Sequence, residues 1–151
     1  MSVYLVQHGQ AKTEDEDPER SLTDRGVDDA GRVARLSVDR LGVRAGRIFH
    51  SGRSRARQTA EIWGRLLGVA VEQGDALAPN DDPATWAERL AGDADGLILV
   101  GHLPHLGRLA ALLLTGDSDD TVISFRPGGL VGLERAGTGW AVSVVLPPEA
   151  A

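Results

Sequence analysis

Three side chains suited to phosphate chemistry lie far apart in this sequence: His8, Arg55 and His102. Each follows a short apolar run of the kind that forms a buried strand. A neutral imidazole nitrogen can attack phosphorus and carry the phosphoryl group covalently. A guanidinium can hold two phosphoryl oxygens, and a second histidine, if protonated, supplies another charged donor. The combination favours phosphoryl transfer through a histidine.

The sequence around these residues predicts alternating strands and helices. Strands are expected at 1–7, 47–50, 69–72 and 96–100, with a hairpin of 129–134 and 140–146; helices are expected at 22–41, 53–67, 83–90 and beyond His102. Residues 10–21 are polar and predict a loop. We therefore expect an α/β fold, a three-layer α/β/α sandwich with a mostly parallel central sheet and an antiparallel C-terminal edge hairpin.

That architecture predicts where the chemistry takes place. Ligands of open α/β sheets bind beyond the carboxyl ends of the strands. His8, the segment 51–55 and His102 all follow predicted strands. We expect these three segments to converge on one crevice.

Composition limits the class of protein. The chain has 151 residues, 42% of them hydrophobic and 25% charged, which predicts one globular domain over residues 1–151. Its net charge of -6 argues against a nucleic-acid partner. The chain has no cysteine, which excludes disulfides and thiolate metal sites. We see neither a signal peptide nor a run of about 18 apolar residues for a membrane helix, so a cytoplasmic location is expected.

Four ordered motifs carry a resemblance to a known family. They are Leu5-Val6-Gln7-His8-Gly9, Leu22-Thr23-x-x-Gly26, Ser51-x-x-x-Arg55-Ala56-x-Gln58-Thr59 and Val100-Gly101-His102-Leu103-Pro104. Over nearly the whole chain they resemble the histidine phosphatase (phosphoglycerate mutase-like) superfamily. The short length and the His-Leu-Pro step look most like its SixA-type phosphohistidine phosphatases.

The resemblance implies a fold, a mechanism and a set of site residues. It implies a phosphoglycerate mutase-like fold, a covalent intermediate on His8, and catalytic roles for Arg55 and His102, with no cofactor. The implied phosphate-binding residues are Gln7, His8, Gly9, Ser51, Arg55 and His102. Inorganic phosphate or sulfate is expected to fit the same pocket.

Two features depart from the family pattern. Gln7 stands where the family motif has arginine, which removes one positive charge from the predicted pocket. Lys12 or Arg53 could compensate for this loss, or Gln7 could suit a less charged substrate. The general acid is also unassigned, and the candidates are Asp81 and Asp82. A phosphohistidine substrate needs such an acid less, because imidazole leaves more readily than an alkoxide.

Three functions remain open. The first is a phosphatase for phosphohistidine on a protein, which an open site without a capping insertion favours. The second is a phosphatase for a small phosphomonoester. The third is a pseudophosphatase that binds phosphate or phosphohistidine without turnover, and Gln7 motivates it.

Other polar residues are given simpler roles. His102 and His105 are three residues apart, but no third ligand has a suitable spacing, so no metal site is expected. His105 is expected to be exposed or at the rim of the pocket. The acidic run 14–19 is expected to be a solvated loop beside the pocket, where it could select a basic partner surface.

Overall fold

A computed structural model describes residues 1–92 and 95–151, and it confirms the predicted α/β fold. The elements are β1 (Ser2–Gln7), α1 (Asp24–Asp39), β2 (Arg47–His50), α2 (Ser54–Leu67), β3 (Val71–Gln73), α3 (Ala84–Ala91), β4 (Leu97–Gly101), α4 (His105–Thr115), β5 (Leu130–Ala136), β6 (Gly139–Leu146) and the short 3₁₀ helix η1 (Pro148–Ala150). Every predicted element is present, and the bounds differ by one or two residues for most of them.

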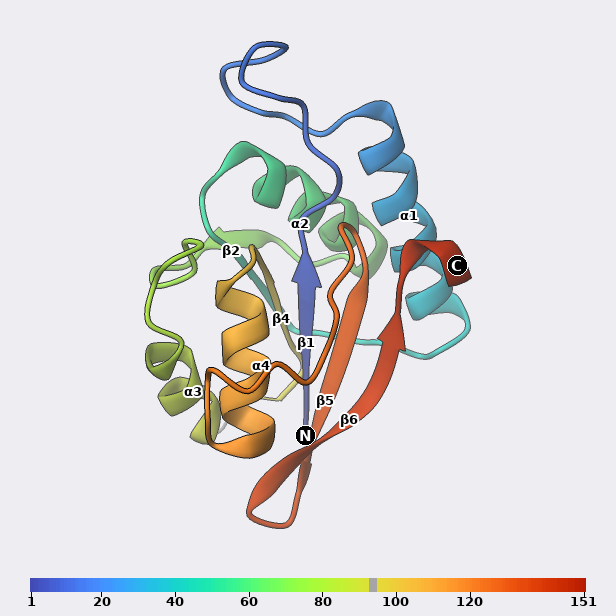
Figure 1. Ribbon diagram of the computed structural model, residues 1–151. Coiled ribbons are helices and arrows are strands. Elements are labelled where there is room, and N and C mark those ends of the chain that lie inside the picture. Colours follow the sequence, from blue (N-terminus) through green and yellow to red (C-terminus); the bar gives the residue numbers. More distant parts are fainter. Residues whose placement is uncertain (93–94) are drawn as a thin grey trace.

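The six strands form one sheet in the order β3-β2-β4-β1-β5-β6. The first four strands in this order are mutually parallel, whereas β5 runs antiparallel to β1 and pairs with β6 as the C-terminal hairpin. The mostly parallel sheet with an antiparallel edge hairpin is therefore confirmed. The order places β2, β4 and β1 side by side, so their carboxyl ends meet at one edge (Figure 1).

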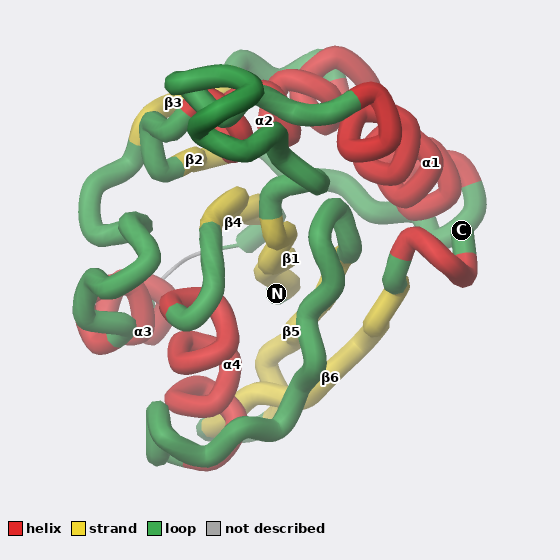
Figure 2. The backbone as a smooth tube through the Cα atoms, turned by 45° about the horizontal axis from the view of Figure 1, so that its top comes forward, coloured by secondary structure: helices red, strands yellow, loops and turns green. Residues whose placement is uncertain are grey.

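Helices cover both faces of the sheet and give three layers (Figure 2). α1 and α2 pack on one face around Val33, Ala60 and Trp63, all fully buried. α3 and α4 pack on the other face, where Leu90, Leu106 and Leu109 meet the strands. Within the described residues, no helix is long and apolar enough to cross a membrane.

Local signals explain where α1 begins. The side chain of Thr23 accepts a hydrogen bond from the N–H of Gly26 at 3.0 Å, as an N-cap threonine should. Gly26 itself is required by packing, because a Cβ there would lie 2.2 Å from the carbonyl oxygen of Gln10. The Leu-Thr-x-x-Gly motif thus sets both the start of α1 and its close approach to the loop after β1.

The loop between β1 and α1 leaves and rejoins the fold at adjacent points. Ala11 and Leu22 form an isolated antiparallel bridge, and Lys12 N–H donates to the carbonyl of Ser21 at 2.8 Å. The residues between them project beyond the end of β1 at the top of Figure 1. Near the end of this projection, Arg20 has φ of 52°, a left-handed conformation that is uncommon for a residue with a side chain.

Candidate active site

The predicted convergence of strand ends is observed. His8 follows β1, Ser51 follows β2 and His102 follows β4, and these strands are neighbours in the sheet. The rings of His8 and His102 have centroids 5.0 Å apart, and Ser51 Oγ lies 2.6 Å from His102 Nε2. Arg55 is the second residue of α2, which begins three residues after Ser51.

His8 has a defined tautomer. Its Nδ1 lies 2.7 Å from the carbonyl oxygen of Gly9. A carbonyl only accepts, so Nδ1 must carry the proton and Nε2 holds the lone pair. Burial lowers the pKa of His8, and the charges of Arg55 and Arg20 lower it further, although the bond to Gly9 opposes them. His8 is therefore neutral near pH 7, with a nucleophilic nitrogen at Nε2.

His102 is almost fully buried, with 2% of its surface exposed. Burial is the main cause that lowers its pKa to about 3, and the charges of His8, when protonated, and of Arg55 lower it further. Its Nε2 contacts Ser51, and its Nδ1 has no hydrogen-bond partner. In this environment His102 is neutral. The sequence suggested that a protonated His102 donates to the phosphoryl group. Protonation at neutral pH would require a bound phosphoryl dianion, because its negative charge raises the pKa of a neighbouring histidine.

Arg55 lies in the first turn of α2, where backbone N–H groups and the helix dipole favour an anion. Its Nε is buried and has no hydrogen-bond partner. Burial lowers the pKa of Arg55, and the neighbouring charges of Arg20 and Arg53 lower it too. Among the described residues, none of these three arginines forms an ion pair with a carboxylate. The cluster is an uncompensated positive site.

Arg20 is the residue that sequence reasoning missed. Its charge acts on both His8 and Arg55, which places it beside the pocket. Its Nε donates to the carbonyl of Lys12 at 3.1 Å, so the base of the loop holds it in place. Position 20 lies in a polar loop with no recognisable spacing to His8, and only its place two residues before Leu22-Thr23 links it to a motif.

Lys12 and Arg53, the two cations that could compensate for Gln7, differ in position. Arg53 acts electrostatically on Arg55 and His102, so it lies near the pocket. Lys12 instead acts within the loop, where hydrogen bonds are the main cause that lowers the pKa of Glu16 and Asp17 and the charge of Lys12 adds to it.

Gln7, which stands in the position of the family arginine, is 9% exposed. Its Oε1 is buried and has no hydrogen-bond partner. An unsatisfied buried oxygen is costly, and it contributes no positive charge. Gln7, the neighbour of His8 in the chain, thus has a side-chain oxygen without a partner in the described protein.

Gly9, Gln58 and Thr59 hold the site together. Gly9 N–H donates to Thr59 Oγ1 at 3.0 Å, and Leu22 N–H donates to Gln58 Oε1 at 2.8 Å. A Cβ on Gly9 would lie 2.8 Å from the carbonyl oxygen of Gly26, so glycine is required by the contact with α1. The N–H of Gly9, one of the predicted phosphate ligands, is thereby engaged by α2.

Asp81 and Asp82 are not joined to the histidine–arginine cluster by any described contact. Asp81 Oδ2 accepts from Ala78 N–H and Asp82 Oδ1 from Ala84 N–H, both at 2.9 Å, so each carboxylate stabilises its own turn. Their charge acts on His105. No residue within the described ranges takes the place of a general acid in contact with His8.

The expectation for His105 was wrong. This histidine is fully buried at the start of α4, and both ring nitrogens lack a partner. Burial lowers its pKa, so it is a neutral core residue. The turn before α4 directs it inward, together with Leu106, beneath the loop that carries Asp81. Among the described residues, no group of three or more His, Asp or Glu side chains could hold a metal.

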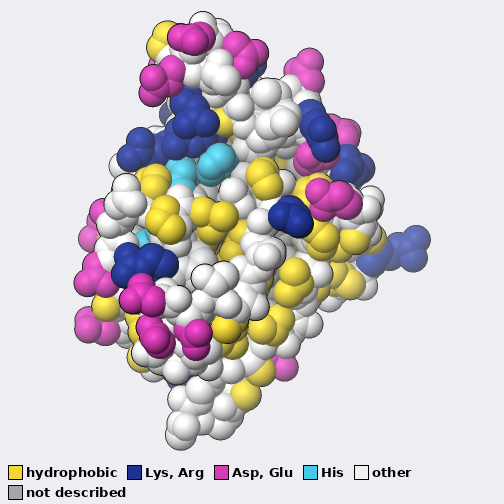
Figure 3. Space-filling view, in the orientation of Figure 1, with side chains coloured by type: hydrophobic (Ala, Val, Ile, Leu, Met, Phe, Trp, Pro, Cys, Tyr) yellow, Lys and Arg dark blue, Asp and Glu magenta, His cyan; other side chains and the backbone are white. Residues whose placement is uncertain are grey.

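The surface around the site is strongly divided in charge. Acidic side chains gather on the loop at the top of Figure 3, and basic side chains and histidines lie directly below it. Apolar side chains continue below the histidines, over α4 and β5. The pocket therefore lies between an acidic lobe and a partly apolar surface.

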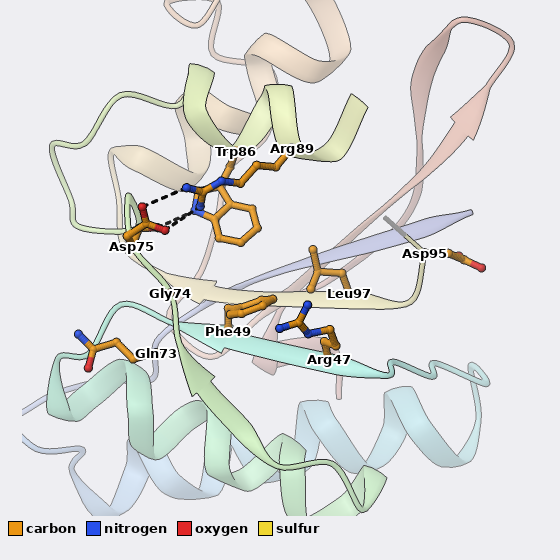
Figure 4. A pocket seen from close by; sticks show the side chains of 9 residues that line it. All are labelled: Arg47, Phe49, Gln73, Gly74, Asp75, Trp86, Arg89, Asp95 and Leu97. Atoms are coloured by element: carbon orange, nitrogen blue, oxygen red, sulfur yellow. Dashed lines mark hydrogen bonds and ion pairs between the residues drawn. The ribbon is translucent and has the colours of Figure 1, made fainter. Parts of the chain in front are cut away.

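A separate cavity of about 410 Å³ lies between β2, β3 and α3 (Figure 4). Phe49 and Trp86 form its aromatic walls, with ring centroids 5.5 Å apart. The guanidiniums of Arg47 and Arg89 lie over these two rings. This cavity contains none of the predicted site residues.

Comparison with known families identifies one match. A model described as histidine phosphatase superfamily (branch 1) matches residues 3–81. An uncharacterised protein of Picosynechococcus sp. is 33% identical over 141 residues, which cover 88% of this chain and 84% of that protein.

Solved structures give the same fold. The protein histidine phosphatase SixA complexed with tungstate has a TM-score of 0.86 at 24% identity, covering 98% of this chain and 97% of that one. A putative phosphohistidine phosphatase SixA from Agrobacterium tumefaciens has a TM-score of 0.79 at 26% identity, with 97% of both chains covered. The alpha-ribazole phosphatase from Shigella flexneri has a TM-score of 0.78 at 15% identity, covering 98% of this chain and 97% of that one.

Proposed function

The chain belongs to the histidine phosphatase superfamily, and from this premise we propose that it hydrolyses phosphohistidine on a protein through a covalent intermediate on His8. One observation carries the proposal: two neutral histidines, with ring centroids 5.0 Å apart, lie within the electrostatic influence of three arginines that have no carboxylate partner in the described chain. Such a site is built to receive a multiply charged anion next to a nucleophilic nitrogen.

The first step transfers the phosphoryl group to the enzyme. His8 Nε2 attacks phosphorus in line, a new N–P bond forms, and the N–P bond to the substrate imidazole breaks with its electron pair. The hydrogen bond from Nδ1 to Gly9 keeps Nε2 aimed at the pocket and stabilises the charge that develops on the ring. Solvent water supplies one proton to the departing imidazole nitrogen, so the substrate histidine leaves as a neutral imidazole.

The second step returns His8 to its starting state. Water attacks phosphorus, the N–P bond to His8 breaks, and inorganic phosphate leaves with the protons of water. In both steps the equatorial oxygens carry the charge, and Arg55 can hold two of them. Arg20, Arg53 and the N-terminus of α2 add positive potential at the same position. No metal or cofactor takes part in this proposal.

The leaving group supports phosphohistidine over an alkyl phosphate. Asp81 and Asp82 are engaged by backbone N–H groups, and neither contacts His8 or His102. An alkoxide needs a proton from a general acid as it leaves, whereas an imidazole is a weaker base and needs less assistance. A small phosphomonoester therefore ranks second, although the alpha-ribazole phosphatase of the same fold acts on one by name.

A phosphate-binding module without turnover is a further candidate, and Gln7 is the observation that favours it. Its unsatisfied Oε1 lies where the family motif has a cation. A lost charge-assisted hydrogen bond of about 1.5–3 kcal/mol would slow phosphoryl transfer by roughly one to two orders of magnitude. Measured turnover decides between a slow enzyme and a binding module.

Trapping the intermediate tests the proposal. The protein is incubated with a ³²P-labelled phosphohistidine peptide in the presence of EDTA, quenched, and mapped by mass spectrometry. We expect acid-labile, base-stable label on His8, release of inorganic phosphate in EDTA, and neither in His8→Ala. Label on a serine, label that persists in His8→Ala, or turnover that requires added metal would contradict the mechanism.

A further inference from the structure

A groove begins one residue beyond His102 and leads away from the proposed site. It has a volume of about 340 Å³ and is lined by two segments, 103–108 and 118–126. The first segment is the turn before α4 and the first turn of that helix. The second belongs to the connection from α4 to β5, which passes in front of α4 in Figure 1 and beside it in Figure 2.

The floor of the groove is apolar and fixed. Ile123 and Phe125 pack against the core of the α3–α4 face and so anchor the connecting segment. Leu103 is 41% exposed although it adjoins the buried His102, and its Cδ2 lies 3.6 Å from the Cβ position of Gly107, back over α4. Pro104 is also exposed. An exposed leucine beside a catalytic pocket offers apolar surface to whatever occupies the groove.

Two arginines give the groove its charge. Arg108 and Arg126 both line it, and neither forms an ion pair within the described chain. Asp117, Asp119 and Asp120 lie in the same connection, next to the lining residues Ser118 and Thr121, but are not among the residues that line the groove. The side-chain contact of Arg108 is a long one of 3.5 Å to Ser118 Oγ. On the other side of His8, the projecting loop carries five acidic residues: Glu14, Asp15, Glu16, Asp17 and Glu19. Figure 3 shows acidic side chains gathered on this loop, whereas no acidic residue is among the described residues that line the groove.

We propose that this groove binds the segment of the protein substrate next to its phosphohistidine, and that it selects an apolar side chain accompanied by acidic ones. The proposal rests on the proposed function, and it places the substrate chain in the groove because Leu103, which lines it, directly follows His102. The apolar side chain is buried against Leu103 and Ile123, and acidic side chains meet Arg108 and Arg126. The acidic loop disfavours the opposite placement of the same segment, because like charges repel.

Two peptides and one charge reversal test the selection. Histidine peptides are phosphorylated chemically, with the phosphohistidine flanked on both sides by Leu and either Glu or Lys. The wild type should prefer the Glu peptide in kcat/KM, measured relative to an aryl phosphate. Arg126→Glu should lower the relative kcat/KM for the Glu peptide by about tenfold and raise it for the Lys peptide, as replacing one attraction by one repulsion allows. Leu103→Ser should weaken both peptides alike.

Arg40→Glu is the matched control. Arg40 is exposed at the C-cap of α1, so the variant changes the net charge by the same amount away from the groove. An equal shift in peptide preference in Arg40→Glu would overturn the proposal, because overall charge would then explain it. So would an unaltered preference in Arg126→Glu. The proposal would also be overturned if the enzyme hydrolysed a small bisphosphate better than both peptides and Arg126→Glu raised the KM for that bisphosphate. The occupant of the groove would then be a small molecule.

Binding separates this proposal from the proposed function. The same peptides, dye-labelled and unphosphorylated, are titrated with wild type and Arg126→Glu and followed by fluorescence anisotropy. A preference for the Glu peptide that Arg126→Glu reverses, without turnover of any phosphopeptide, supports the groove and refutes the phosphatase. Turnover without such a preference supports the phosphatase and refutes the groove.

Discussion

Arginines in two regions of this protein have opposite surroundings. In the cavity of Figure 4, Arg47 and Arg89 each contact a carboxylate, Glu72 and Asp75, through two nitrogens, at 2.8–3.2 Å. These hydrogen bonds raise the pKa of both guanidiniums. At the carboxyl ends of the strands, Arg55 has no such partner, and burial beside other arginines lowers its pKa.

The difference in ion pairing suits one region to a structural role and the other to binding an anion. A guanidinium stacked on an aromatic ring and paired with a carboxylate already has its charge satisfied, so it stabilises the local structure. A buried guanidinium with an unpartnered Nε and like charges around it is unfavourable until an anion arrives. A cavity with good shape but satisfied charges is thus a weaker candidate for anion chemistry than a pocket whose cations are unpaired.

The largest difference is expected between two variants, each of which removes one arginine from one of the two regions. Arg55→Ala should lower kcat/KM for a phosphohistidine peptide at least about 100-fold, by analogy with the loss of one preorganised oxyanion donor. Arg89→Ala should change it by less than about twofold, because an exposed, paired arginine contributes little beyond its own pair. Steady-state kinetics of both variants, with folding checked by circular dichroism, makes the comparison. Equal losses would mean that the paired arginine also serves the reaction.

An intermediate effect is expected from adding a cation. Gln7→Arg should raise kcat/KM by about tenfold, since it places one charged donor beside the transferred oxygens. The gain should be greater in an Arg20→Ala background, where one neighbouring cation is already missing. Thr138→Arg, in the exposed turn between β5 and β6, adds the same charge elsewhere and serves as the control. No gain in either background would show that Gln7 suits its substrate.

The smallest effect concerns stability, and the two regions should respond in different pH ranges. His102 has its pKa lowered from 6.5 to about 3, so the unfolded chain binds its proton first. The contribution of neutral His102 to the free energy of unfolding is complete above pH 6.5. It is lost as the pH falls toward the pKa of His102 in the folded state. At pH 5 the loss is up to about 2 kcal/mol, with His8, His50 and His105 acting in the same direction.

Asp75 should act at lower pH. Its pKa is lowered from 3.8 by Arg89, so its contribution is complete above pH 3.8 and is lost below it. Denaturant unfolding at several pH values checks both ranges. His102→Asn should flatten the dependence between pH 6.5 and 5, whereas Asp75→Asn should leave that range unaltered. A wild type whose stability is constant from pH 7 to pH 5 would contradict the neutral burial of His102.

The sequence predicted the parts of the site that depend on strand ends. His8, Ser51 and His102 follow buried strands, and the rule for parallel sheets brings such positions together without any knowledge of strand order. The elements were equally predictable, because apolar periodicity and the Thr23 cap are local signals. The side-chain tautomer of His8 and its contact with Gly9 needed the three-dimensional arrangement.

Two residues show why the remainder could not be predicted. Arg20 itself has the left-handed conformation, near the end of a long loop. The conformation of that loop depends on contacts between residues far apart in the sequence, such as Ala11 and Leu22. His105 was expected to be exposed or at the rim of the pocket, yet it is fully buried at the start of α4. In both cases the direction of a side chain, rather than its place in the sequence, decided the outcome.

The bridge between Ala11 and Leu22 has a consequence for how relatives of this protein can diverge. It closes the loop at its base, so residues 13–19 can be lengthened, shortened or exchanged while β1, α1 and His8 keep their positions. The free energy of closing a loop grows only slowly with its length, by roughly 0.6 kcal/mol for each doubling. Arg20 lies two residues before Leu22, which closes the loop, so insertions ahead of Arg20 would leave its cation in place. Selection can therefore alter the acidic lobe and its choice of partner independently of the phosphate chemistry, and grafting this loop between relatives is a route to new specificity.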